Sequence, residues 1–120
     1  MGQEHFKPSM VKDPQEQRKL VAHLEQIDFA TFDANRVLLA KSVGRVDLGT
    51  FKRLANMAAA ARATWVKEAL AVSDKGVAPT EAQIKHLALL RSTFEELSEA
   101  YEATRRMVER GYLCYLETGG

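Results

Sequence analysis

The chain has 120 residues, of which 46% are apolar and 8% aromatic, and its 17 Lys and Arg nearly balance its 16 Asp and Glu. This apolar content is too high for a disordered chain, because burying it offsets the entropy of ordering. A net charge of +1 argues against a protein that coats nucleic acid or an anionic membrane, since both need many uncompensated positive charges. We expect one modest globular domain.

A single cysteine, Cys114, can form neither an intramolecular disulfide nor a cysteine-based zinc site. Such cysteine usage fits a reducing compartment. The first ten residues lack the apolar run of a signal peptide, and nowhere do 18 apolar residues follow one another. The sequence therefore predicts a cytoplasmic protein that does not span a membrane.

Residues 13–16 carry the start signal of a first helix. Asp13 is a suitable N-cap, Pro14 suits the first helical position, and Glu16 can complete a capping box. Beyond them, apolar and small residues alternate in steps of four and three, which aligns side chains on one helix face. This stripe consists of Leu20, Leu24, Ile27, Thr31, Ala34 and Leu38. Gly44 is a natural C-terminal cap, so we expect the helix to end before it.

A second row of apolar residues lies beside this stripe. At 100° per residue, Val21, Phe32 and Leu39 lie roughly 100° to 120° from the stripe, with Asn35 between the two rows. The apolar arc is therefore wider than one neighbouring helix covers. We favour a wide three-helix core that absorbs the arc, because broad arcs are ordinary in globular helices. The alternative is that a second copy or another protein covers part of it.

A second helix is predicted over residues 48–73, with Asp47 as its N-cap. Its stripe keeps the same spacing and is interrupted only at Arg62, whose stem we expect over the core and whose guanidinium we expect to reach water or a glutamate. The stripe consists of Leu48, Phe51, Ala55, Ala58, Trp65, Ala69 and Val72. Residues 74–79 contain a glycine and a proline that end this helix.

A third helix begins at Thr80, which forms a capping-box pattern with Gln83. Its stripe holds a coiled-coil register for three heptads. The stripe consists of Leu87, Leu90, Phe94, Leu97, Tyr101, Thr104 and Val108. No stretch shows the sustained two-residue alternation of a strand, so the sequence predicts no β-sheet.

Short connections between long helices favour antiparallel neighbours. The predicted fold is therefore all-α: an up-down-up antiparallel bundle of three long helices, open to completion by a partner or a second copy. We expect a flexible N-terminal arm over residues 1–12, a single helical-bundle domain over residues 13–116, and a frayed end over residues 117–120.

Sequence patterns for phosphate loops, elbow serines and paired zinc-binding histidines are all missing. Glu81 and His86 are five residues apart, whereas a helical di-iron site uses Glu-x-x-His. His23 and His86 lie beside the stripes, where a phosphorelay histidine would lie, but ordinary surface histidines are the favoured interpretation. We predict no enzyme activity, no metal site and no cofactor.

The third helix carries acidic residues followed by basic ones. They are Glu95, Glu96, Glu99, Glu102, Arg105, Arg106 and Arg110. Pairs such as Glu102 with Arg105 or Arg106 suit the helix dipole, so a self-paired, solvated face is the favoured interpretation. The alternative is that this charge step docks a partner of complementary charge, through Glu95, Glu99, Arg106 and Arg110.

Residues 111–117 are rich in apolar and aromatic side chains for a chain end. Tyr112, Tyr115 and Leu116 either pack back on the bundle or anchor in a partner's groove. These two interpretations stay open.

The segment 40–54 resembles a helix-turn-helix in part. An alanine stands four residues before Gly44, and Lys41, Arg45, Lys52 and Arg53 are placed to meet phosphates. Six residues separate the glycine from the next core residue, however, where the motif has five, so a plain inter-helix turn is favoured. DNA binding through these four basic residues is the alternative function.

The sequence thus predicts a non-enzymatic helical module for protein–protein interaction: an adaptor, assembly or regulatory subunit, with homodimerisation as one form of association. A small DNA-associated regulator or packaging component is the second hypothesis, and a phosphorelay protein is the third.

Overall fold

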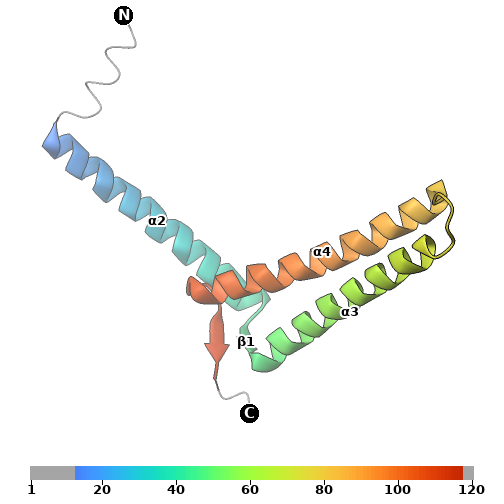
Figure 1. Cartoon of the computed structure of the whole chain (residues 1–120). Helices are drawn as coiled ribbons and strands as arrows, with labels where there is room; N and C mark the ends of the chain where they lie inside the picture. Colours follow the sequence, from blue (N-terminus) through green and yellow to red (C-terminus); the bar gives the residue numbers. More distant parts are fainter. Residues whose placement is uncertain (1–12, 118–120) are drawn as a thin grey trace, which may run out of the picture. The chain divides into compact units, whose positions relative to one another are not determined.

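The computed structural model describes residues 13–117, and most of them are helical. The described elements, in chain order, are α2 (Pro14–Ser42), β1 (Arg45–Asp47), α3 (Leu48–Ser73), α4 (Glu81–Glu109) and β2 (Cys114–Leu116) (Figure 1). The helical class of the fold is confirmed. The expected arm over residues 1–12, and residues 118–120 of the expected frayed end, lie outside the described residues.

The chain divides into two compact units, with the boundary between Leu38 and Leu39. The described part of the first unit is helix α2 up to this boundary. The second unit contains the last turn of α2, both strands, α3 and α4.

Helix α2 begins at the predicted place. The Asp13 carboxylate accepts a hydrogen bond from the Gln15 N–H at 3.0 Å, and the Asp13 carbonyl accepts one from the Gln17 N–H at 3.0 Å. At the other end, Gly44 has φ 83°, and its N–H donates to the Leu39 carbonyl at 3.0 Å. This left-handed conformation is the reason that a glycine ends the helix.

Capping boxes begin both helices of the second unit. Asp47 accepts a hydrogen bond from the Thr50 N–H, and its own N–H donates to the Thr50 hydroxyl. Thr80 and Gln83 exchange the equivalent pair at the start of α4. Both predicted N-caps are therefore confirmed, because each side chain satisfies an N–H group that the helix leaves free.

Helices α3 and α4 pack side by side as an antiparallel hairpin (Figure 1). Midway along it, the Trp65 and Phe94 rings stack with centroids 6.0 Å apart. The Arg62 guanidinium carbon lies 5.3 Å from the centroid of the Phe94 ring. We expected this guanidinium to reach water or a glutamate. It instead lies over the Phe94 ring, where a cation–π contact forms between α3 and α4.

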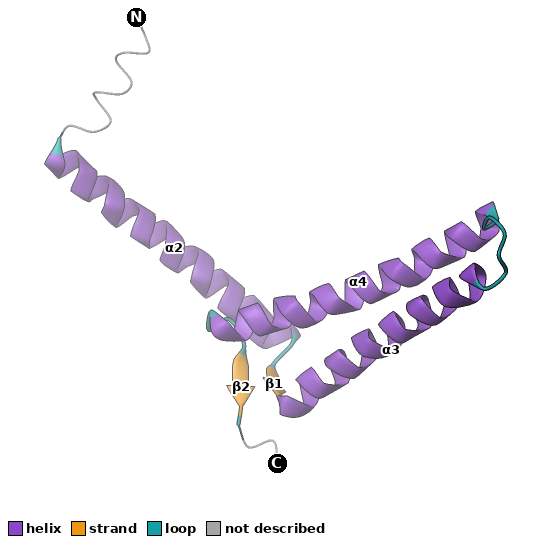
Figure 2. Cartoon of the chain, in the orientation of Figure 1, coloured by secondary structure: helices purple, strands orange, loops and turns teal. Residues whose placement is uncertain are grey.

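Strands β1 and β2 pair in parallel, with Val46 opposite Tyr115 (Figure 2). The prediction of no β-sheet is wrong at these six residues. Three-residue strands are too short to display the alternation that marks a strand in sequence, and pairing partners on either side of a helical hairpin share no local signal.

The C-terminal segment packs back on the hairpin. Val46 and Leu113 are the most deeply buried apolar residues described, at 4% and 5% exposure. The Phe51 ring lies 5.8 Å from that of Tyr101, edge to face, and 6.2 Å from that of Tyr115. Strand pairing and ring contacts therefore show that this segment packs on its own chain, and its use as a partner anchor stays a prediction.

We expect Leu113→Ala to lower the free energy of unfolding by about 2–4 kcal/mol, because it removes a buried side chain and leaves a cavity. The matched control is Leu89→Ala, which makes the same chemical change at a residue that is 63% exposed and should change stability by less than about 0.5 kcal/mol. Urea unfolding followed by circular dichroism measures both. Equal losses would show that Leu113 is not part of the core.

The Asp47 cap predicts a pH dependence. Hydrogen bonds from the Thr50 N–H and hydroxyl hold the pKa of Asp47 below its ordinary value, and the charge of Arg53 lowers it further. A carboxyl group whose pKa is lower in the folded than in the unfolded state stabilises the fold at pH values above its unfolded-state pKa. This stabilisation is lost as the pH falls through the folded-state pKa. Asn caps a helix equally well but does not titrate.

We therefore expect the difference in unfolding free energy between the wild type and Asp47→Asn to shrink as the pH falls below about 4. Urea unfolding at a series of pH values measures this difference. A difference that stays constant through the acid range would contradict the assigned carboxylate cap.

Candidate functional site

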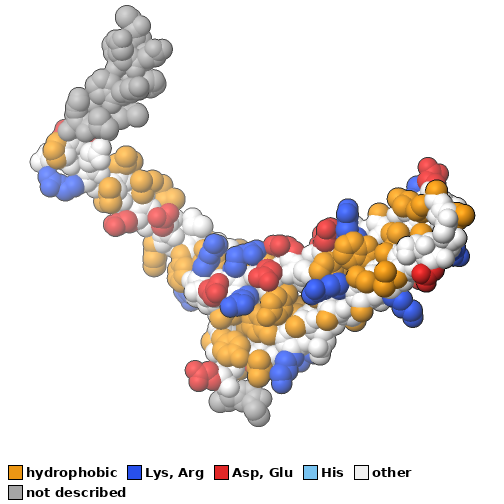
Figure 3. Space-filling view, viewed as in Figure 1, with side chains coloured by type: hydrophobic (Ala, Val, Ile, Leu, Met, Phe, Trp, Pro, Cys, Tyr) orange, Lys and Arg blue, Asp and Glu red, His pale blue; other side chains and the backbone are white. Residues whose placement is uncertain are grey.

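Helix α2 presents an exposed apolar face. It has 29 residues and none of them is buried. Leu24, Ile27 and Leu38 of the predicted stripe are 48%, 58% and 61% exposed, and apolar side chains recur among the charged ones along this helix (Figure 3). The exposed large apolar residues of this face are Leu20, Val21, Leu24, Ile27 and Leu38. Phe29 and Val37 are also exposed, but they lie about 180° and 100° from the stripe around the helix. Helices in proteins owe most of their stability to packing such a face, so this surface is a candidate interface.

One carboxylate stands within this apolar face. At 100° per residue, Asp28 lies about 40° from Leu24 and about 20° from Val21, between the stripe and the second apolar row. Within residues 13–117 Asp28 forms no ion pair, whereas Asp33 on the same helix binds Arg36 at 2.7 Å. A surface that covers the apolar face must therefore offer Asp28 a cation or a hydrogen-bond donor, because an unpaired buried charge is costly.

The α3–α4 hairpin carries a complementary surface. One shallow hollow is lined by Trp65, Ile84, Leu87, Ala88 and Arg91, and a second by Ala55, Ala58, Ala59, Arg62, Ser98, Tyr101 and Glu102. Arg91 and Ser98, like Ala59 and Val66, are seven residues apart and therefore within about 20° of each other around their helix. The hollows thus share one face, which we call the arginine groove; its lining includes Ala55, Ala59, Arg62, Ile84, Ala88, Arg91 and Glu102. Val66 lies on the same face of α3.

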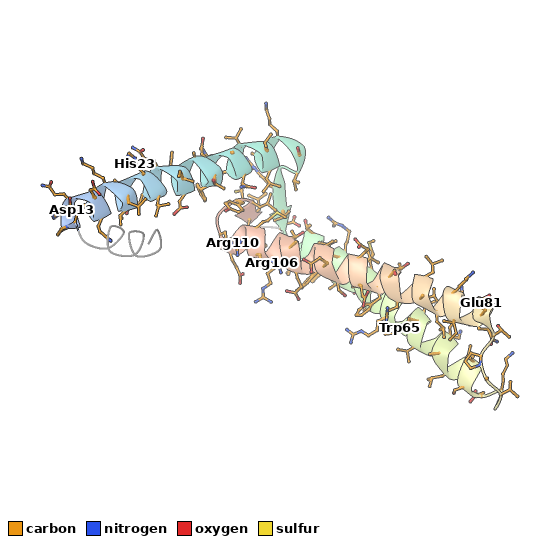
Figure 4. The ribbon with its side chains drawn as sticks, turned by 90° about the horizontal axis from the view of Figure 1, so that it is seen from above. Asp13, His23, Trp65, Glu81, Arg106 and Arg110 are labelled. Carbon is orange, nitrogen blue, oxygen red and sulfur yellow. The ribbon has the colours of Figure 1, made fainter. Side chains whose placement is uncertain are left out.

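The two candidate histidines lie on different helices, His23 on α2 and His86 on α4. Both are exposed; His23 lies on the first half of α2 (Figure 4), and His86 lines a different shallow hollow, which Glu68 also lines. Within residues 13–117, no three His, Cys, Asp or Glu side chains come together as a set of metal ligands.

The charge step on α4 is largely paired within its own helix. Arg106 binds Glu99 at 2.8 Å, and Arg105 approaches Glu109 at 3.8 Å. The predicted pairing of Glu102 with either arginine is wrong, because Arg106 reaches back two turns to Glu99 instead. Arg91 approaches Glu95 in the same way, at 3.7 Å. Figure 4 shows Arg106 and Arg110 on the last turns of α4, where both are exposed.

The aromatic residues proposed as anchors are partly used by the hairpin. Tyr112 and Leu116 are half-buried, and Tyr115 is 38% exposed beside Phe51. The exposed part of each side chain stays accessible, and it is largest for Tyr115.

The four basic residues of the DNA-binding alternative lie on successive elements. Lys41 is in the last turn of α2, Arg45 is on β1, and Lys52 and Arg53 are near the start of α3; all four are exposed. The carboxylate of Asp47 interacts with Arg53, which offsets part of the local positive charge.

Comparison of the chain with protein-family models, with curated proteins and with solved structures finds no match. None of the helices within residues 13–117 is both long enough and apolar enough to cross a membrane.

We expect a double-mutant cycle with Glu99→Ala and Arg106→Ala to give a coupling energy below about 1 kcal/mol, because exposed ion pairs are screened by water and salt. Thermal unfolding of the wild type, both single variants and the double variant measures it. A larger coupling would show that the charge step is a structural network rather than a solvated face.

Proposed function

We propose that this chain is a non-enzymatic helical interaction module that works as an adaptor, assembly or regulatory subunit. The observation that carries the proposal is the exposed apolar face of α2, with Leu24 and Ile27 at its centre. The exposed free thiol of Cys114 fits a reducing compartment, and we place the protein in the cytoplasm.

The energetics support association through this face. The stripe offers four Leu and Ile side chains, Leu20, Leu24, Ile27 and Leu38, which are 48–61% exposed. Covering the exposed half of each contributes roughly 0.8–1.5 kcal/mol, while association costs roughly 4–15 kcal/mol. A stable complex therefore needs the second apolar row to be covered as well, as in a three-helix bundle completed by a partner or a second copy.

Two observations argue against DNA binding. The net charge is only +1, and the carboxylate of Asp47 offsets part of the positive charge of Arg53. The protein-interaction role uses the exposed apolar face of α2, whereas DNA binding would leave that face unexplained.

We expect the double substitution Leu24→Glu and Ile27→Glu to abolish the binding of protein partners, because it places two charges in the stripe. The measurement compares immobilised wild-type and variant protein for what each retains from a lysate of the source cells, quantified by mass spectrometry. A protein retained by the wild type and lost from the variant supports the proposal.

The matched control is Ala22→Glu with Gln26→Glu, which adds two glutamates to the opposite face of α2. This control should retain every partner that the wild type retains. If the wild type retains no protein that the stripe variant loses, the interaction role is wrong.

A further inference from the structure

We infer that α2 of one copy docks in the arginine groove of a second copy, with Asp28 facing Arg62 and Arg91, and that the two copies do this reciprocally. This inference rests on the proposed interaction role of α2 and names its partner as another copy of this chain.

The two surfaces match in length and shape. Helix α2 has 29 residues, and α3 and α4, which form the groove, have 26 and 29. At 1.5 Å per residue, each spans about 40 Å. The groove is lined by the small side chains of Ala55, Ala59 and Ala88, which let another helix approach closely, whereas the stripe of α2 carries bulky side chains that fill such hollows.

The surfaces also match in apolar character. Val66 and Leu70 on α3 are 44% and 60% exposed, and Ile84 on α4 is 50% exposed. Val66 lies about 40° from both Arg62 and Leu70 around the helix, so an apolar rim borders the charged part of the groove. Leu24 and Ile27 border Asp28 on α2 in the same way.

Charge complementarity identifies the pairing most directly. Asp28 is the carboxylate inside the apolar face of α2, and Arg62 and Arg91 are the cations inside the apolar surface of the hairpin. Glu102 lines the same hollow as Arg62, so Asp28 fits only a register that places it by the two arginines and away from Glu102. Arg62 is held over the Phe94 ring, and Arg91 has only a loose 3.7 Å contact with the exposed Glu95. Both guanidinium groups are therefore able to receive a carboxylate, and a charge pair buried among apolar side chains is specific because any mispairing leaves a charge unpaired.

A second copy satisfies both surfaces at once. Each chain carries one α2 face and one arginine groove. In a twofold dimer each α2 face docks in the groove of the other copy, so both α2 faces and both grooves are covered and the dimer is closed and isologous. Pairing α2 with another α2 would leave Asp28 without a cation and would leave the groove uncovered.

The test uses two charge reversals in the full chain, Asp28→Lys and Arg91→Glu. The matched controls are Asp33→Lys and Lys67→Glu, which make the same charge changes away from the apolar face of α2 and away from the groove. The ion pair that Asp33 loses with Arg36 is exposed, so its loss should change the fold little. Sedimentation equilibrium over a wide concentration range gives the dimer dissociation constant of each protein. Circular dichroism verifies that each variant retains the wild-type helix content.

We expect a concentration-dependent wild-type dimer and at least a tenfold increase in the dissociation constant for either Asp28→Lys or Arg91→Glu, with both controls unchanged. An equimolar mixture of Asp28→Lys and Arg91→Glu should regain wild-type affinity. In this heterodimer one groove pairs reversed charges with each other, and the other groove pairs two wild-type surfaces.

Three results would overturn the inference. One is a protein that stays monomeric at all concentrations, as expected if α2 is covered by its own chain or by a foreign protein. In that case, partner retention that depends on Leu24 and Ile27 would still support the proposed interaction role. Another is a dimer that Arg91→Glu does not weaken, which indicates pairing through α2 alone. The third is a mixture that does not recover affinity. Loss of both self-association and partner retention would end the inference and the proposed function together.

Discussion

The parallel pairing of β1 with β2 joins the two ends of the helical hairpin. β1 leads directly into α3, and β2 follows α4 after a short turn. The hydrogen bonds between the two strands therefore hold together the end of the hairpin that lies opposite the α3–α4 connector. Val46 and Leu113 are buried there, and the Phe51 ring contacts Tyr101 and Tyr115. Because the arginine groove exists only while α3 and α4 stay in register, the surface proposed for docking depends on this closure.

The helices were predictable because their limits are encoded locally. The sequence indicates the Asp47 N-cap and the capping box of Thr80 with Gln83, and the structure contains both. Gly44 ends α2 at a positive φ. The strands could not be found in this way, because a three-residue strand is specified by its remote partner. The completion of a three-helix bundle also stays a prediction, since it concerns contacts that no local pattern encodes.

Only part of the candidate interface could be predicted from the sequence. The stripe through Leu24 and Ile27 follows from spacing, and the structure shows it exposed. Asp28 was overlooked, although its helical position relative to Leu24 already places it inside the apolar arc. The arginines of the groove could not be assigned from sequence, because their role depends on which face of α3 meets α4 and on the ring of Phe94 beneath Arg62.

The separation between β1 and β2 along the chain also orders the assembly of the hairpin. Helices α3 and α4 are joined by a short connector, so their contacts can grow from that turn with little loss of loop entropy, whereas the strands must close a loop containing both helices. Val46 and Leu113 therefore meet late in folding. Until they do, the apolar end of the hairpin is accessible to the same segment of a neighbouring molecule, and strand exchange between copies is the expected error of folding at high concentration.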